Sequence, residues 1–491
     1  MIHNFSRIII EPAVILHYYI LVNYFGRCEI PELAIYYISL RRRIIMEKFF
    51  KLKEMGTDVR TEIMAGVTTF LSMVYILAVN PSILSASGMD SASIFTATAI
   101  SAGVATLLMA FLANYPVALA SGMGLNAYFA FTVCPMVGTD HPWEVALAAI
   151  LVEGIIFVLL SFTNFRESLV NDIPQNLKSS ISVGIGLFIA IIGLKNSGAV
   201  SVTTENGIAL GNLGDAGICL SLVGILVIAL FAHKGFKGAI FYGILVTWVL
   251  GMVAQLIGWY VPNPEAGVYS VMPNFSVSGV KMDYLFAFDF GWIASHILQF
   301  ATIVFSFLYV DIFDTVGTLI GVATKADLLD EEGKLPKAKE ALLSDAIGTC
   351  LGACLGTSTV TSFVESSAGA AAGGRTGLAS VSTGVLFLIS LVLSPLFLSI
   401  PSFATTPALV YVGYLMMTNI KNVKFEDAPF SEIISAFLAI IMMPFTSSIA
   451  NGIMFGIISY LVLKCCEGHA KDIKPVMWIS GGLFVIYMIV G

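Results

Sequence analysis

Two aspartates lie three residues apart in the stretch VDIFDTVGTLIG (310–321), which follows a long apolar run. Asp311 and Asp314 would be about 60° apart around a helix axis, so they share one helix face. A third acid, Glu365, lies in another apolar stretch. An aspartate at the centre of a membrane helix costs roughly 2.5–3.5 kcal/mol on insertion scales, so we expect these acids to serve a function. They can form one site only if their two segments pack together.

Each acid also has a structural interpretation, as a hydrogen-bond partner between helices or, for Asp314, as a helix-end residue facing cytosolic water. Glu153 and Asp345 have no polar neighbours in the sequence, and for them we favour the structural interpretation. The small-residue run SSAGAAAGG (366–374) permits close helix approach, which by itself indicates only tight packing.

The residues around these acids indicate the chemistry of a ligand. No Arg, Lys or His accompanies them inside the apolar segments, so an anionic substrate is disfavoured. A neutral or cationic solute with N–H donors fits better, and the edge of a heterocyclic base is such a solute. A carboxylate accepts from its N–H groups, the Asn126 amide pairs with a donor and an acceptor together, and an aromatic ring such as Phe363 covers its flat face.

Composition places these residues in a membrane. The chain has 491 residues, of which 57% are hydrophobic and 12% charged, against about 25% charged in soluble domains. Apolar runs of about 17–25 residues recur along nearly the whole length. The sequence therefore excludes soluble enzyme folds and predicts an all-α polytopic membrane protein.

The apolar runs and their breakers predict fourteen transmembrane segments. They are expected near 60–84, 92–114, 117–135, 143–163, 174–194, 216–233, 238–258, 292–322, 338–355, 357–373, 376–399, 404–418, 430–446 and 449–466. The last apolar run, 476–490, is short for a span, and we expect an interfacial or packed tail there.

The distribution of basic residues supports this count. If the N-terminus is cytoplasmic, all Lys and Arg residues except Lys195 and Lys281 fall on the cytoplasmic side. The sequence therefore predicts a multi-pass protein of the cell membrane with both termini in the cytoplasm.

Fourteen segments also suggest a repeat of seven. The stretch 238–250 aligns with 451–463 through several apolar and glycine positions, and an odd number of spans per repeat inverts the second copy. The third and tenth segments, 118–133 and 355–374, each begin with a Gly, Ser and Thr stretch and continue as a run long enough for only half a helix. Paired interruptions of this kind indicate a transporter's binding site, because half-helix N-termini direct their dipoles at the midplane.

The first 45 residues differ from the rest. Their apolar run is only about 13 residues long, which fits neither a signal peptide nor a span, and Met46 opens a plausible leader. We expect residues 1–45 to be a non-native or unstructured extension. The seven cysteines show no disulfide framework or metal-ligand spacing, so no metal site is predicted.

Four stretches together resemble a known family. They are GMGLNAYFAFTV (122–133), VDIFDTVGTLIGVATKADLLDEEG (310–333), LLSDAIGTCLGACLGTSTVTSFVESSAGAAAGGRTGLASV (342–381) and MPFTSSIANGIMFGIISYL (443–461). From Met46 to the C-terminus, the chain resembles the AzgA-like purine permeases of the nucleobase:cation symporter-2 (xanthine/uracil permease) family.

The resemblance implies a seven-plus-seven inverted repeat in which a core domain moves against a gate domain. The core would comprise 46–163 and 291–399, and the gate 164–290 with its outer loop and 400–491. It implies proton-coupled uptake of hypoxanthine, guanine or adenine, with the proton as coupling ion and no cofactor. The sequence leaves the preferred purine open, and also whether the protein is a monomer or a homodimer. Partners other than the purine, the proton and membrane lipid are not expected, and nucleic acid is excluded.

The resemblance also assigns residues. Substrate binding is expected at Asn126, Asp311, Phe363 and Glu365, and proton coupling at Asp311, Asp314 and Glu365, with supporting hydroxyls from Thr315, Thr318 and Ser366. Uracil-type members place a histidine where this chain has Thr315, so a histidine-based proton path is not expected here.

Two other classes remain open. A sulfate- or bicarbonate-type anion transporter shares the general architecture, but it would carry basic or neutral groups in place of Asp311 and Glu365. An intramembrane aspartyl protease needs buried aspartates on two helices, and its usual Tyr-Asp and Gly-x-Gly-Asp signatures are absent.

Overall fold

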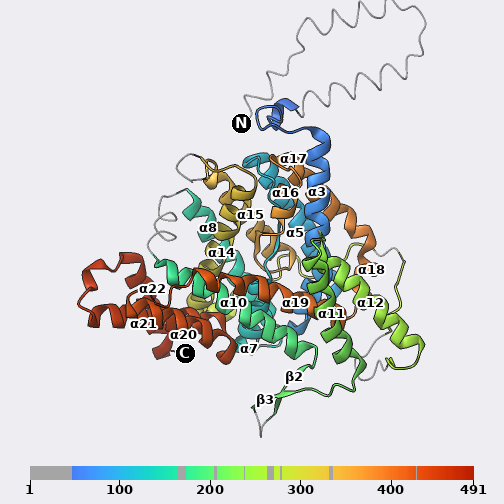
Figure 1. Cartoon of the computed structure of the whole chain (residues 1–491). Coiled ribbons are helices and arrows are strands. Elements are labelled where there is room, and N and C mark those ends of the chain that lie inside the picture. The colour runs from blue at the N-terminus through green and yellow to red at the C-terminus, as the bar shows by residue number, and fades with distance from the viewer. Residues whose placement is uncertain are drawn as a thin grey trace, which may run out of the picture. The chain divides into compact units, whose positions relative to one another are not determined.

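The computed structural model describes residues 47–162, 173–203, 207–236, 238–262, 270–276, 279–330, 335–426 and 428–490. The chain divides into two units, Met1–Val59 and Arg60–Gly491. In the first unit, the described residues form turns closed by bonds such as Leu52 N–H to Glu47 O. The predicted extension 1–45 lies outside the described residues. Everything below concerns the second unit (Figure 1).

This unit is built almost entirely of helices, as predicted. In chain order the longer ones are α3 (Val59–Met73), α4 (Ile76–Leu84), α5 (Ser91–Leu112), α8 (Pro142–Ser161), α10 (Gln175–Asn196), α11 (Ala216–His233), α12 (Ala239–Leu256), α14 (Ile297–Lys325), α15 (Ala338–Leu355), α17 (Gly377–Ile389), α19 (Ser402–Met417), α20 (Phe430–Thr446), α21 (Ile449–Cys466) and α22 (Pro475–Val490). Shorter pieces are α13 (Gly291–Ser295) and α18 (Ser394–Leu398). Side chains cap several starts; for example, the Asp90 carboxylate accepts from the Ser93 amide at the start of α5.

The membrane prediction is confirmed. Among the described residues, nine helices are long and apolar enough to cross a membrane. Each of the fourteen predicted segments coincides with helix, or with strand followed by helix, within a few residues. The others are shorter, interrupted or more polar, so the count of fourteen spans stays a prediction.

One part of the chain departs from the expected helix-and-loop pattern. A hairpin of β2 (Val200–Thr203) and β3 (Gly207–Leu210) lies between α10 and α11 and was not predicted. The run 476–490, expected to be an interfacial or packed tail, forms α22, which packs against α14 and α21. The Phe484 and Phe305 rings meet edge to face with their centroids 5.4 Å apart.

The third and tenth segments are interrupted as predicted. The third runs from β1 (Leu119–Ser121) into α6 (Met123–Tyr128), a π-helical turn (Phe129–Val133) and α7 (Cys134–Val137). The tenth runs from β4 (Val360–Ser362) into α16 (Ser366–Ala371). The strands pair antiparallel, with Leu119 opposite Ser362 and Ser121 opposite Val360. Their backbone groups therefore satisfy each other inside the protein, as irregular backbone at membrane depth requires.

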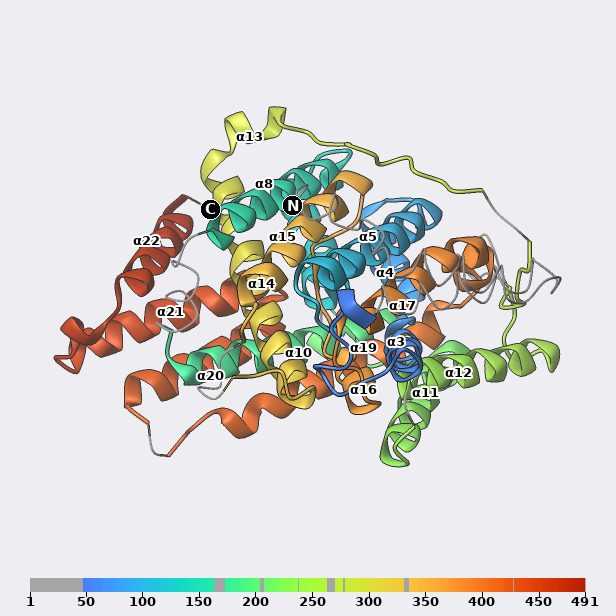
Figure 2. The ribbon, with the colours of Figure 1, turned by 90° about the horizontal axis from the view of Figure 1, so that it is seen from above.

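Helix contacts fall into two sets. In one, α5 packs on α4, α15 and α17, and α8 packs on α14 and α15; in the other, α10 packs on α19, α20 and α21, and α11 and α12 pack on each other and on α19. Figure 2 shows α14 and α15 beside α8, and α11 beside α12. The sets meet where α4 touches α19 and α6 touches α10.

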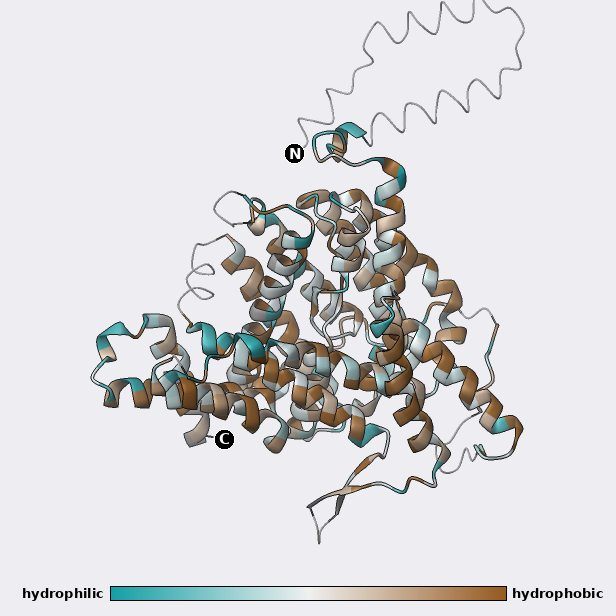
Figure 3. Cartoon of the chain, viewed as in Figure 1, coloured by the Kyte–Doolittle hydropathy of each residue, from teal (hydrophilic) through white to brown (hydrophobic). Residues whose placement is uncertain are grey.

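The outer faces of these helices are apolar. Large side chains such as Leu226, Leu230, Val249 and Val253 are exposed on α11 and α12. Figure 3 shows hydrophobic colour along these helices. Exposed apolar surface of this extent is expected where a helix faces lipid.

Candidate functional site

Helix α14 carries the two aspartates from which the prediction began. Asp311 is fully buried and Asp314, almost one turn later, is half-buried. Thr315 is fully buried, and Thr318 is half-buried one turn beyond Asp314. The helix packs against β4 and α16, so the eighth and tenth segments do meet.

Glu365 directly precedes α16, which packs on α14. It is half-buried, and its carboxyl group interacts electrostatically with that of Asp314. Glu365 was predicted to share a site with the α14 aspartates if the two segments packed together, and the structure brings Asp314 and Glu365 together.

One partner of Glu365 was not predicted. Tyr75 lies between α3 and α4, and its phenolic O–H donates a hydrogen bond of 2.6 Å to Glu365 Oε1. Tyr75 is 1% exposed, so the donor of this bond is buried, while Glu365 is half-buried. A tyrosine in an apolar run is common in membrane proteins, and no local signal in the sequence identifies this one.

Asp345 has polar partners that the sequence did not indicate. On α15 it is fully buried, and it accepts hydrogen bonds from Thr315 Oγ1 (2.9 Å, to Oδ2) and from Ser362 Oγ (3.1 Å, to Oδ1). Thr315 Oγ1 also lies 3.5 Å from Asp311 Oδ1. Asp345 was interpreted as structural because its neighbours in the sequence are apolar; its partners come instead from α14 and β4. Thr315 thus lies between the carboxyl groups of Asp311 and Asp345.

Asn126 lies in α6 and belongs to a buried polar network. Its Oδ1 accepts from Ser121 Oγ (2.8 Å), and Ser121 Oγ in turn accepts from Thr357 Oγ1 (3.3 Å). Asn80 of α4 donates to Thr357 (2.9 Å) and to Thr98 of α5 (2.7 Å). The network joins both interrupted segments to α4 and α5, and α6 also touches α14.

Phe363 and Ser366 join the two interrupted segments through the backbone. The Phe363 amide donates to Ala118 O (2.9 Å), and Ser366 Oγ accepts from the Ala118 amide (3.0 Å). Phe363 is 6% exposed, so its ring lies in the protein interior. The Ser366 hydroxyl, predicted as a supporting polar group, therefore accepts from a backbone amide at the start of the third segment.

The small residues of the tenth segment pack directly on α3. A Cβ added at Gly369 would lie 2.7 Å from the Ala65 carbonyl oxygen and would collide with the Thr69 hydroxyl. A Cβ at Gly374 would lie 2.9 Å from Ala65 Cβ. Only glycine permits this approach, so the tight packing indicated by the sequence is present.

Glu62 of α3 is a buried acid that the sequence analysis did not single out. It is fully buried and accepts from the amides of Arg375 (2.8 Å), Thr376 (3.3 Å) and Ala379 (3.2 Å) at the start of α17. The Arg375 guanidinium donates to the carbonyls of Ala370 and Gly374. These bonds fix the end of the tenth segment against the first span. The sequence signal that could have found Glu62 is its place two residues into a predicted span.

Glu153 of α8 is fully buried and interacts electrostatically with Cys350 of α15. Its structural interpretation stays a prediction. Within the described part of the chain, no group of three or more His, Cys, Asp or Glu residues is arranged to hold a metal ion.

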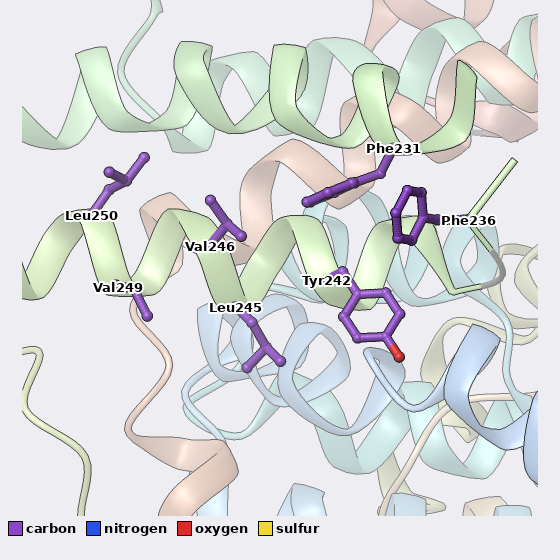
Figure 4. Close-up of a pocket in the computed structure, with 7 residues that line it drawn as sticks. All are labelled: Phe231, Phe236, Tyr242, Leu245, Val246, Val249 and Leu250. Atoms are coloured by element: carbon purple, nitrogen blue, oxygen red, sulfur yellow. The ribbon is translucent and has the colours of Figure 1, made fainter. Parts of the chain in front are cut away.

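An apolar groove of about 700 Å³ lies along α11 and α12. Figure 4 shows its lining side chains, which are Phe231, Phe236, Tyr242, Leu245, Val246, Val249 and Leu250. The Tyr242 hydroxyl is the one side-chain polar group among them, so the groove offers too few hydrogen-bonding groups to recognise a base edge. The carboxyl groups of Asp314 on α14 and Glu365 just before α16, here called the acidic cluster, suit that task better.

Three comparisons place the chain among known proteins. A protein-family model described as "Permease family" matches residues 60–455. The chain is 40% identical over 446 residues to the adenine permease AdeP of Escherichia coli K12, covering 91% of this chain and 96% of that protein. It is 41% identical over 454 residues to the guanine/hypoxanthine permease PbuG of Bacillus subtilis 168, covering 90% and 99%.

Solved structures show the same fold at low sequence identity. The transmembrane domain of the cyanobacterial bicarbonate transporter BicA is similar with a TM-score of 0.57 and 13% identity, over 80% of this chain and 97% of that domain. This likeness shows the architecture alone.

Proposed function

The chain belongs to the xanthine/uracil permease (nucleobase:cation symporter-2) family, and on that premise we propose that it imports the purine nucleobases hypoxanthine, guanine and adenine by proton symport. It is a transporter and not an enzyme. The observation that carries the substrate proposal is the pair of carboxyl groups, Asp314 and Glu365, that lie together where α14 meets the tenth segment.

Glu365 suits an N–H donor of a base edge. One of its oxygens accepts from Tyr75, which leaves the other oxygen as an acceptor for the substrate. Asp311 on the neighbouring helix offers a second acceptor, while Asn126 and Phe363 provide an amide and an aromatic ring within the interrupted segments. A purine presents ring N–H groups and a flat face, so it matches these groups.

The same cluster supports coupling to a proton. The carboxyl groups of Asp314 and Glu365 interact, and two negative charges repel more strongly where burial reduces the water around them. A proton on one of the pair removes this repulsion. The loaded site then crosses the apolar gate with less charge to desolvate, which would link proton entry to purine entry. Asp311, Asp314 and Glu365 are the proposed proton-coupling groups, and Thr315 and Thr318 are the supporting hydroxyls of α14.

We assign the movement to an elevator of a core against a gate. The core comprises 46–163 and 291–399, and the gate comprises 164–290 and 400–491. The two sets of helix contacts support this division, because the helices of the first set fall within the proposed core ranges and those of the second set within the proposed gate ranges. Fourteen spans in two inverted repeats, with both termini cytoplasmic, complete the proposal.

The substitution Glu365→Gln tests the substrate site. It keeps the size of the side chain but removes its charge, so purine uptake should fall to background while the protein still reaches the membrane. Glu340→Gln, at an exposed position on α15, is the control and should transport normally. Undiminished uptake by Glu365→Gln would reject the assignment. Uptake that follows a sodium gradient instead of a proton gradient would reject the coupling ion.

The alternative of a sulfate- or bicarbonate-type anion transporter has only the fold in its favour. In the proposed site, the carboxyl groups of Asp311 and Glu365 would repel a bound anion when ionised. Competition of uptake by sulfate but not by purines would favour the alternative.

A further inference from the structure

Tyr75 marks a break in the first predicted span. The chain runs in α3 to Met73 and resumes in α4 at Ile76. Between them, the Leu77 amide donates to Val74 O (3.1 Å) and the Ala78 amide donates to Tyr75 O (3.0 Å). These backbone hydrogen bonds span three residues, as in a 3₁₀-helix, where an α-helix spans four. Such a stretch inside a helix often marks a functional hinge or strain. The residue at this break carries the hydroxyl that reaches Glu365.

The contact has the geometry of a strong hydrogen bond. The Tyr75 hydroxyl oxygen and Glu365 Oε1 are 2.6 Å apart, which falls within the range of hydroxyl bonds to a carboxylate. Both the ring and the hydroxyl are enclosed by protein, since Tyr75 is 1% exposed. Burying a tyrosine hydroxyl without a partner costs free energy, and Glu365 provides that partner.

Helix packing fixes the two residues in register. Gly369 and Gly374 bring the tenth segment into contact with Ala65 and Thr69 of α3. Tyr75 follows this contact on the first span, and Glu365 precedes it on the tenth segment. The Tyr75–Glu365 bond therefore lies at one end of a close-packed helix pair and depends on no flexible loop.

We propose that Tyr75 is the positioning residue of the purine site: its hydroxyl holds Glu365 Oε1, so that Oε2 is presented to an N–H of the base. This inference rests on the proposed function, because it gives Tyr75 its role through Glu365. It predicts that loss of the hydroxyl weakens purine binding while the transport cycle itself remains intact.

Tyr75→Phe tests the role directly, because it removes the hydroxyl and keeps the ring. The KM for purine uptake should rise about tenfold or more, as expected for a lost hydrogen bond to a charged group, while the maximal rate per transporter at the membrane stays within about twofold. Tyr460→Phe, which removes a hydroxyl from a buried tyrosine of α21, is the matched control and should leave KM unchanged. An unchanged KM in Tyr75→Phe overturns the inference. So does a loss of maximal rate at constant KM.

An infrared comparison of purified protein separates this inference from the proposed function. The carboxyl band of Glu365, identified by its loss in Glu365→Gln, should shift in Tyr75→Phe and not in Tyr460→Phe; an unmoved band overturns the contact. This measurement holds even if wild-type protein takes up no purine, a result that would defeat the proposed function alone. If Tyr75→Phe does not reach the membrane, 3-fluorotyrosine at position 75 keeps the ring and the hydroxyl but alters the donor. A changed KM and a shifted Glu365 band then support the inference, and the absence of both overturns it.

Discussion

Thr315 has one hydroxyl proton and two carboxyl neighbours. It donates to Asp345 across 2.9 Å and lies 3.5 Å from Asp311. All three residues are fully buried, so none of them can exchange its partner for water. The hydroxyl therefore links a proposed substrate residue on α14 to an acid on α15.

This link predicts a difference between two small substitutions. Thr315→Val removes the donor but keeps the shape, and a lost hydrogen bond to a buried charged group costs about 1.5–3 kcal/mol. We expect the ratio of maximal rate to KM for purine uptake to fall ten- to a hundredfold. Thr315→Ser, which keeps the hydroxyl, should lose much less. Equal uptake by the two variants would show that the hydroxyl does not support the site.

At the scale of elements, the start of α17 depends on an acid from another helix. Glu62 of α3 accepts three amide hydrogen bonds there, from Arg375, Thr376 and Ala379. The first amides of a helix have no partner within the helix, and a carboxylate also favours the positive end of its dipole. Glu62 thus joins the first span to the tenth and eleventh segments.

Replacing Glu62 should lower the stability of the protein, and it removes no residue of the proposed purine site. Glu62→Gln turns an amide N–H₂ toward backbone donors, and we expect a loss of about 1–3 kcal/mol in stability. A lower melting temperature in detergent would report it, with the exposed Glu340→Gln as control. An unchanged melting temperature would contradict the capping role of Glu62.

Ion pairs connect the loop that precedes α13 and α14 to the start of α5. Lys281 pairs with Asp283 (3.0 Å) and with Asp90 (3.1 Å), the cap of α5. Burial opposes ionisation of Asp90, but the Ser93 amide and Lys281 outweigh it and hold the pKa of Asp90 below its usual value. Hydrogen bonds to Asp283 and Asp90 raise the pKa of Lys281.

The signs of these shifts define a pH window. A lowered pKa of Asp90 stabilises the fold above the ordinary aspartate value of about 3.9, and this contribution is lost as the pH falls. A raised pKa of Lys281 stabilises below about 10.4, and this contribution is lost as the pH rises. The drop in melting temperature caused by Lys281→Met should therefore be constant between about pH 6 and 9 and shrink toward pH 4. A drop that grows on acidification would contradict the pairing. The side chains of Lys281 and Asp90 are 48% and 40% exposed, so water screens the pair and a small effect is expected.

The elements themselves could largely be predicted from the sequence, because long apolar runs and Gly-, Ser- and Thr-rich interruptions are local signals. The site could be predicted in part: Asp311, Asp314 and Glu365 are conspicuous as acids among apolar residues. The partners of Tyr75 and Glu62 could not be predicted, since they lie 290 and 313 or more positions away and depend on how α3 packs on the tenth segment. The partners of Asp345, Thr315 and Ser362, could not be predicted for the same reason, and its structural interpretation stays a prediction. The hairpin β2–β3 was not predicted, although the stretch VSVTT (200–204) followed by Asn206-Gly207 is a typical hairpin pattern.

At the scale of the molecule, the proposed elevator requires the two sets of helices to slide past each other. One contact between them is the hydrogen bond of 3.0 Å from Thr132 Oγ1, in the third segment, to Ser447 O at the end of α20. A cross-link here would hold the sets together.

Cysteines at these two positions test the movement. In a background without native cysteines, Thr132→Cys combined with Ser447→Cys should lose uptake on oxidation and regain it on reduction. Each single variant should be insensitive to the oxidant. Continued uptake by fully cross-linked protein would contradict sliding of the core against the gate.

The central claim is that the acidic cluster takes up purines together with protons. Its most direct test is uptake of radiolabelled hypoxanthine, guanine, adenine and xanthine by cells that lack their own permeases, with and without a protonophore. The account predicts uptake of one or more of hypoxanthine, guanine and adenine that collapses with the proton gradient and competes with unlabelled purine but not with sulfate. Cells that accumulate none of these bases, although the protein is present in their membrane, would contradict it.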